Sequence, residues 1–114
     1  MDSILTSVKQ YLGYGEDYKP FDAEITMHIN SVFIDLTQIG IGPEEGFYIK
    51  DEYDIWSDFI PESNKQFESI KEYVFLNVKL LFDPPASASH IDAIERKIKK
   101  LEWRFHMIID NPKN

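Results

Sequence analysis

The side chains able to do acid–base or metal chemistry are scattered along the chain rather than grouped at catalytic spacing. The three histidines are His28, His90 and His106, and none pairs with another at a spacing typical of metal ligands. The chain has no cysteine, which excludes a disulfide framework, a thiolate zinc site and a cysteine nucleophile. Gly40-Ile41-Gly42 lacks the further glycine and the lysine of a phosphate-binding loop. We therefore predict a protein that is not an enzyme and that has no cofactor and no metal site.

Carboxylates gather between residues 44 and 62, interleaved with aromatic side chains. An EF-hand calcium loop needs oxygen ligands at alternate positions and a glycine at the sixth. A loop starting at Asp51 instead places Tyr53, Ile55 and Trp56 at those positions. We interpret the run as a solvated or partner-facing acidic loop, with a divalent-ion or acid–base site as the lesser alternative. The candidate residues of this acidic surface are Glu44, Glu45, Asp51, Glu52, Asp54 and Asp58.

Hydrophobic periodicity predicts an all-α fold, a small bundle of about four helices with one long irregular loop between the second and third helix. The expected helices cover residues 3–12, 23–39, 63–82 and 89–109. Ser3, Asp22 and Ser89 are the expected N-caps, because their side-chain oxygens can accept a hydrogen bond from a free backbone N–H. We expect one helical domain over residues 1–109 and a polar C-terminal tail over residues 110–114.

Residues 40–61 interrupt the helical pattern, because glycines and Pro43 cluster at their start. Residues 47–49 are a candidate for a short strand, and residues 55–59 for a short helix. Connections of this length are uncommon inside a compact domain and are usually functional or ordered by a partner.

The last two expected helices carry apolar side chains beyond a single face. Helix 63–82 is apolar on two faces, which is typical of a central helix or of one shared with a neighbouring chain. On helix 89–109, Trp103 and Met107 point away from the main apolar stripe, beside Arg96 and Lys100. Arginine, tryptophan and methionine are enriched at interfaces, although Trp103 packing beneath the N-terminal helix or the long loop is an equal alternative. The candidate interface residues are Phe47, Tyr48, Trp56, Phe59, Arg96, Lys100, Trp103 and Met107.

The net charge of −8 is unevenly distributed along the chain. Residues 1–89 carry 16 acidic and 6 basic side chains, whereas residues 90–114 carry 4 acidic and 6 basic side chains. Two ends of opposite sign suit a subunit that associates head to tail, and an ordinary acidic protein with a basic last helix is the plainer reading. The overall charge disfavours bulk attraction to nucleic acid or to an anionic membrane. We also expect no secretory signal and no membrane span.

Several short pieces of the sequence are informative through their order along residues 3–106. They are Met27-His28-Ile29-Asn30-Ser31, Leu36-Thr37-Gln38-Ile39-Gly40, Gly42-Pro43, Trp56 with Phe59, Leu80-Leu81-Phe82-Asp83-Pro84-Pro85, Ile94-Glu95-Arg96-Lys97-Ile98 and Leu101-Glu102-Trp103-Arg104. In this order they resemble the head–tail connector proteins, also called head-completion or adaptor proteins, of siphophages.

The resemblance implies a non-enzymatic, mostly helical structural protein of the virion. It implies a homo-oligomeric ring of about twelve copies beneath the portal protein, assembled in the cytoplasm of the host bacterium. The ring would extend the DNA channel after genome packaging and offer a platform for a stopper or tail-completion protein. The C-terminal part would engage the portal, and acidic surfaces near the channel would let double-stranded DNA slide without sequence-specific binding. The alternative is a small soluble protein-binding or regulatory module of phage origin.

Overall fold

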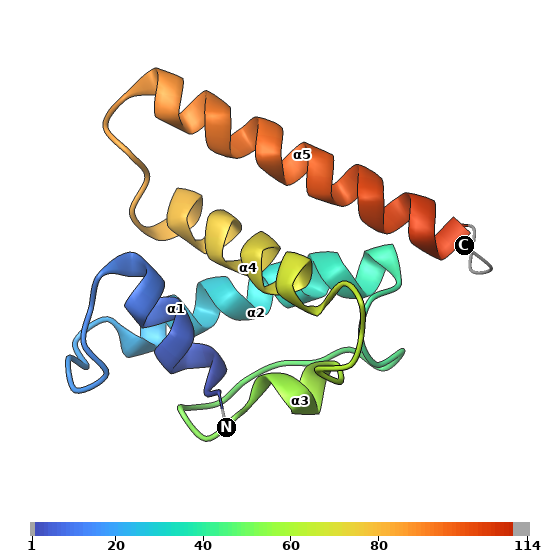
Figure 1. The fold of residues 1–114 in the computed structure, drawn as a ribbon. Helices are drawn as coiled ribbons and strands as arrows, with labels where there is room; N and C mark the ends of the chain where they lie inside the picture. Colours follow the sequence, from blue (N-terminus) through green and yellow to red (C-terminus); the bar gives the residue numbers. More distant parts are fainter. Residues whose placement is uncertain (1, 111–114) are drawn as a thin grey trace.

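The computed structural model describes residues 2–110 of the chain, and these residues form a helical bundle (Figure 1). The helices are α1 (Ile4–Leu12), α2 (Asp22–Ile39), α3 (Trp56–Phe59), α4 (Phe67–Phe82) and α5 (Ala88–Asp110). The predicted all-α fold is therefore confirmed, and α3 is the short helix expected at residues 55–59. The expected polar tail falls almost wholly outside the described residues, of which Asp110 is the last and ends α5.

Local signals account for both ends of α1. Ser3 is the N-cap, and its side-chain oxygen accepts a hydrogen bond from the Thr6 N–H at 3.1 Å. Gly13 ends the helix in the left-handed conformation, with φ of 96°, and its N–H bonds back to the carbonyls of the last turn. The predicted bounds of this helix are confirmed.

The starts of α2 and α5 lie within one residue of the prediction, but their predicted N-caps are wrong. The predicted start of α4 is also wrong. α2 begins at Asp22, which is a first-turn residue paired with Lys9, and Phe21 precedes it without a capping side chain. α4 begins four residues later than expected, because the Asn64 carbonyl and side-chain oxygens accept the N–H groups of Phe67 and Gln66 in a tight turn. α5 begins before Ser89, and Ser87 supplies the capping oxygen to the His90 N–H at 3.4 Å.

Helix α4 lies at the centre of the bundle and contacts α1, α2 and α5. In Figure 1 it runs between α5 above and the remaining helices below. Side chains from both of its apolar faces are buried, with Tyr73 and Leu76 on one side and Ile70, Val74 and Val78 on the other. Its two apolar faces are therefore explained by central packing within one subunit.

Helix α5 runs antiparallel to α4 along one side of the bundle (Figure 1), as the short connection predicts. It contacts α4 and also α2. Ile98, Leu101 and Phe105 are buried beneath it, and Ile91 and Ile94 are half-buried. The Tyr73 hydroxyl donates a hydrogen bond to Glu102 Oε2 at 2.7 Å, and Lys97 lies 3.7 Å from Glu72. The apolar stripe of α5 thus attaches it to α4 and leaves the opposite face outward.

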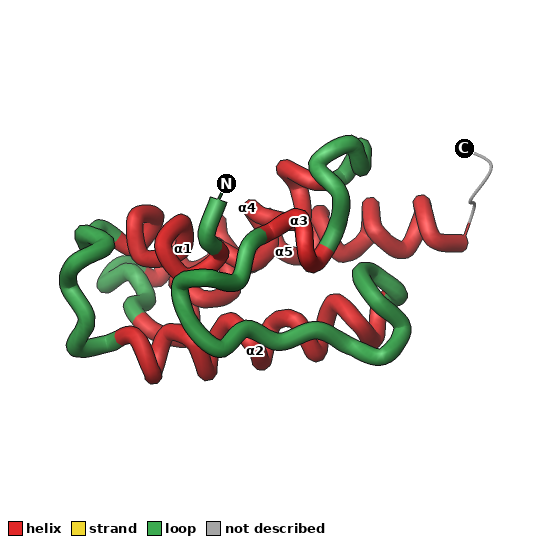
Figure 2. Tube along the Cα trace, turned by 90° about the horizontal axis from the view of Figure 1, so that it is seen from below, coloured by secondary structure: helices red, strands yellow, loops and turns green. Residues whose placement is uncertain are grey.

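The two ends of the long loop between α2 and α4 lie near the end of α5, and its middle part runs beside α2 on the side of the bundle away from α5 (Figures 1 and 2). The expected strand at residues 47–49 is wrong, and no strand forms anywhere in residues 2–110. Instead, the Asn30 side chain pairs with the Ile49 backbone, accepting from its N–H at 2.7 Å and donating to its carbonyl at 3.0 Å. Asp54 Oδ2 accepts from the N–H groups of Lys50 and Asp51. The loop is therefore ordered by contacts within the subunit.

Candidate functional site

Two of the aromatic residues proposed as interface anchors belong to the core. Trp56 is 1% exposed, and its indole N–H donates to the Ser7 hydroxyl at 2.9 Å. Phe59 is also buried, with its ring centroid 4.6 Å from that of Phe33. As anchors for another subunit these residues were wrongly predicted, because α3 folds back onto α1 and α2 and uses their apolar surface internally. Phe47 is half-buried, since it packs on both Phe33 and Phe59.

Two tyrosines of the loop project from the surface. Tyr48 is 67% exposed, because it alternates with the inward-facing Phe47 and Ile49 along an extended segment. Tyr53 is 80% exposed at the turn that Asp51 and Asp54 close with their carboxylates. Tyr53 was missed as a candidate. Its position between acidic turn residues was the available signal.

The six acidic candidates divide into exposed and structural groups. Asp54 closes the turn at residues 50–54, and Glu52 lies 4.0 Å from Lys19. The remaining four carboxylates are exposed, and none forms an ion pair within residues 2–110. We call these four and the two exposed tyrosines the acidic loop surface: Glu44, Glu45, Tyr48, Asp51, Tyr53 and Asp58.

The outer face of α5 carries the second group of candidates. Trp103 is 64% exposed, so the alternative in which it packs beneath the N-terminal helix or the loop is wrong. Arg96, Lys100, Trp103 and Met107 are spaced four, three and four residues apart, which places them along one side of the helix. We call this face, with the neighbouring Lys99, the basic stripe. All of its side chains are exposed.

The basic side chains of the stripe are not neutralised within the subunit. Among the basic residues of α5, only Lys97 forms an ion pair in the described part of the chain, with Glu72. Arg96, Lys99 and Lys100 face solvent beside an exposed tryptophan. Exposed apolar surface with a charged rim is typical of protein interaction sites. The arrangement can therefore bind a protein surface of opposite charge.

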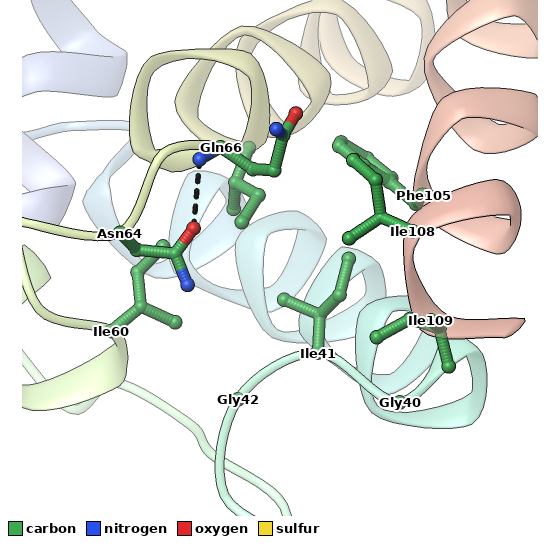
Figure 3. A pocket seen from close by; sticks show the side chains of 10 residues that line it. Gly40, Ile41, Gly42, Ile60, Asn64, Gln66, Phe105, Ile108 and Ile109 are labelled. Atoms are coloured by element: carbon green, nitrogen blue, oxygen red, sulfur yellow. Dashed lines mark hydrogen bonds between the residues drawn. The ribbon is translucent and has the colours of Figure 1, made fainter. Parts of the chain in front are cut away.

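A small apolar pocket lies where the end of α5 meets the start of the long loop (Figure 3). Its volume is about 130 Å³, well below the roughly 300 Å³ at which sites for small-molecule ligands begin. Ile41, Phe105 and Ile108 point into it, and the polar side chains among its described lining residues are Asn64 and Gln66. The described lining residues can hold one apolar side chain but include no acid, base or nucleophile.

Among the described residues, the strong perturbation of one ionisable group, Tyr73, has a structural explanation. Burial raises the pKa of Tyr73 well above its ordinary value of 10.0, and the hydrogen bond to the Glu102 carboxylate raises it further. Among the residues that the structure describes, no group of three or more histidine and carboxylate side chains could hold a metal ion. The same residues include no helix long and apolar enough to cross a membrane.

The family model described as phage connector protein matches residues 4–112. Comparisons with curated proteins and with solved structures give no match. The match extends from the first residue of α1 to just beyond the end of α5, so it includes both exposed surfaces. It also agrees with the resemblance to head–tail connectors noted in the sequence. This chain therefore belongs to the phage connector family, a family of structural phage proteins.

Proposed function

We propose that this chain is the head–tail connector subunit of a siphophage virion. Copies form a ring beneath the portal, extend the DNA channel after genome packaging, and offer a platform for the stopper or tail-completion protein. The observation that carries this proposal is the family match over residues 4–112, nearly the whole chain. Family membership points to a non-enzymatic role and to contacts with other head or tail proteins.

The surface chemistry supports this role. A ring subunit needs two different contact surfaces, because each copy meets one neighbour on each side. The acidic loop surface and the basic stripe are two such surfaces, and they differ in charge and in position. The net charge of −8 also suits a channel that DNA must pass through, because a strongly basic wall would retain the phosphate backbone.

The first experiment measures mass by light scattering, on the chain alone and mixed with the portal ring of the same phage. A ring-sized species, or a monomer that joins the portal in a fixed stoichiometric number, would support the proposal. A monomer that does not bind the portal ring would overturn the proposal in favour of a binding module with another partner.

Replacing Trp103 with alanine tests whether the basic stripe takes part in assembly. Trp103→Ala should leave the thermal unfolding midpoint nearly unchanged, because the side chain is mostly exposed. It should weaken ring or portal association, because exposed aromatic anchors carry much of the affinity at interfaces. Met27→Ala is the matched control, since Met27 is equally exposed on α2. Equal assembly by wild type and Trp103→Ala would exclude the stripe from the contacts.

A further inference from the structure

We propose that the basic stripe of one copy docks on the acidic loop surface of the next copy. This inference rests on the proposed ring and specifies the contact that builds it. The occupant of each surface is thus a second copy of this chain, bound through the opposite surface.

The charges on the two surfaces are complementary and uncompensated. Arg96, Lys99 and Lys100 form no ion pair within residues 2–110, and the same holds for Asp51 and Asp58 on the loop. Two basic stripes placed face to face would repel each other, as would two acidic surfaces. A two-fold contact that places like surfaces together is therefore disfavoured, and a contact between unlike surfaces is favoured.

Each surface also carries apolar anchors among its charges. Trp103 and Met107 extend the stripe, and Tyr48 and Tyr53 project from the loop. Aromatic side chains at the centre of an interface supply most of its affinity, while charges at the rim set register and association rate. Lysine and arginine also bind favourably over tyrosine rings. The two surfaces therefore match in apolar content as well as in charge.

The fold places the two surfaces on opposite sides of the subunit. Figure 1 shows α5 along one side of the bundle and the loop with α3 along the other, with α4 between them. The stripe from Arg96 to Met107 spans about 16 Å of helix, at 1.5 Å per residue. One copy can therefore contact two neighbours at the same time, which a contact repeated by rotation requires.

A charge swap tests the contact. Lys100→Glu and Asp58→Lys change exposed side chains that form no hydrogen bond or ion pair within the described residues, so both variants should fold normally. Each single change should lower the affinity between subunits about tenfold or more, because it places like charges together at every contact. The double variant carries swapped charges on both surfaces and should recover most of the lost assembly. Lys65→Glu is the control, since it alters net charge by the same amount at an exposed position outside both surfaces.

The readout is the fraction of chain in ring-sized species, measured free and on portal rings. If subunits contact each other as proposed, the first copy of each single variant still binds the portal ring. The binding of further copies next to it then loses its cooperativity. Recovery by the double variant supports the contact. Additive loss in the double variant, or loss of first-copy binding to the portal with normal cooperativity, overturns it. A wild-type chain that forms no ring and ignores the portal refutes the proposed function itself, so the two failures are distinguishable.

Discussion

At the scale of single residues, the approach of Gly42 to the Phe59 ring controls how the long loop joins the core. Gly42 has φ of 88°, and a Cβ atom there would collide with the Phe59 ring. We expect Gly42→Ala to lower the free energy of unfolding by about 2–4 kcal/mol, from left-handed strain and overpacking together. Gly46→Ala is the control, with φ of 92° and open space around the added atom, and should cost about 1–2 kcal/mol. Urea unfolding of both variants measures the two losses of free energy of unfolding. Equal losses in Gly42→Ala and Gly46→Ala would contradict the prediction.

Tyr73 makes stability depend on pH in the alkaline range. Its pKa is higher in the folded chain than the value of 10.0 expected when unfolded, because burial and the Glu102 carboxylate disfavour the phenolate. The folded state therefore holds the proton more tightly, so stability is complete below about pH 10 and declines as pH rises above it. Tyr73→Phe should cost about 1 kcal/mol at neutral pH, because Glu102 is partly exposed and can be rehydrated.

The pH profile separates this titration from general alkaline unfolding. Between about pH 9 and pH 11, stability should decline less steeply in Tyr73→Phe than in wild type. Tyr53→Phe is the control, because it removes the hydroxyl of a tyrosine that is 80% exposed. Identical slopes for wild type and Tyr73→Phe would show that this hydroxyl does not contribute.

Residue type alone could not separate the two tryptophans. Both have charged residues within two positions and both were candidates for an interface, yet Trp56 is buried and Trp103 is exposed. The position of Trp103 follows from helical geometry, because it lies opposite the apolar stripe of α5. The position of Trp56 depends on how a short helix after a long loop returns to Ser7, which no local pattern encodes.

At the scale of elements, a buried lysine joins α1 to α2 and to the loop between them. Lys9 is 2% exposed, and its Nζ lies 2.8 Å from Asp22 Oδ1 while donating to the Glu16 carbonyl at 2.9 Å. Asp22→Asn should cost about 3 kcal/mol or more, because it leaves the buried ammonium without a counter-charge. Lys9→Met should cost less, because methionine fills the same space and Asp22 keeps 22% exposure to water.

A double-mutant cycle, with stability measured by urea unfolding, gives the coupling energy between Lys9 and Asp22. The double variant Lys9→Met/Asp22→Asn should cost less than the sum of the single changes, because it removes both charges. Glu24→Gln is the control, as another acid in the first turn of α2, whose Oε2 lies 3.8 Å from His28 Nε2. Strict additivity in the cycle would refute the coupling.

Most elements were predictable from the sequence, and the errors concern their connections. The existence of four longer helices and one short helix follows from apolar spacing and from breakers such as Gly13 and Gly40. The start of α4 and the N-cap of α5 were missed because Asn64 and Ser87 form side-chain hydrogen bonds that several nearby polar residues could equally have formed. The strand expected at residues 47–49 was replaced by pairing with Asn30, which lies 19 residues away.

At the scale of the whole molecule, the separation of charge predicts how assembly responds to salt. In the proposed contact, the basic stripe and the acidic loop surface would attract over distances that salt screens, so assembly should slow as sodium chloride rises from about 0.05 to about 0.5 M. Stopped-flow light scattering of the wild type measures the slope. Lys100→Gln should show a shallower slope, because one attractive charge is lost. A rate that does not change with salt would show that the charges do not steer association.

The placement of two unlike surfaces on opposite sides also gives any assembly of this chain a direction. A row of joined copies would always have a free acidic loop at one end and a free basic stripe at the other, so it could grow from both ends. When curvature brings these ends together, the last contact consumes both of them and growth stops. The number of copies would then be set by the angle between neighbours and not by any separate counting device.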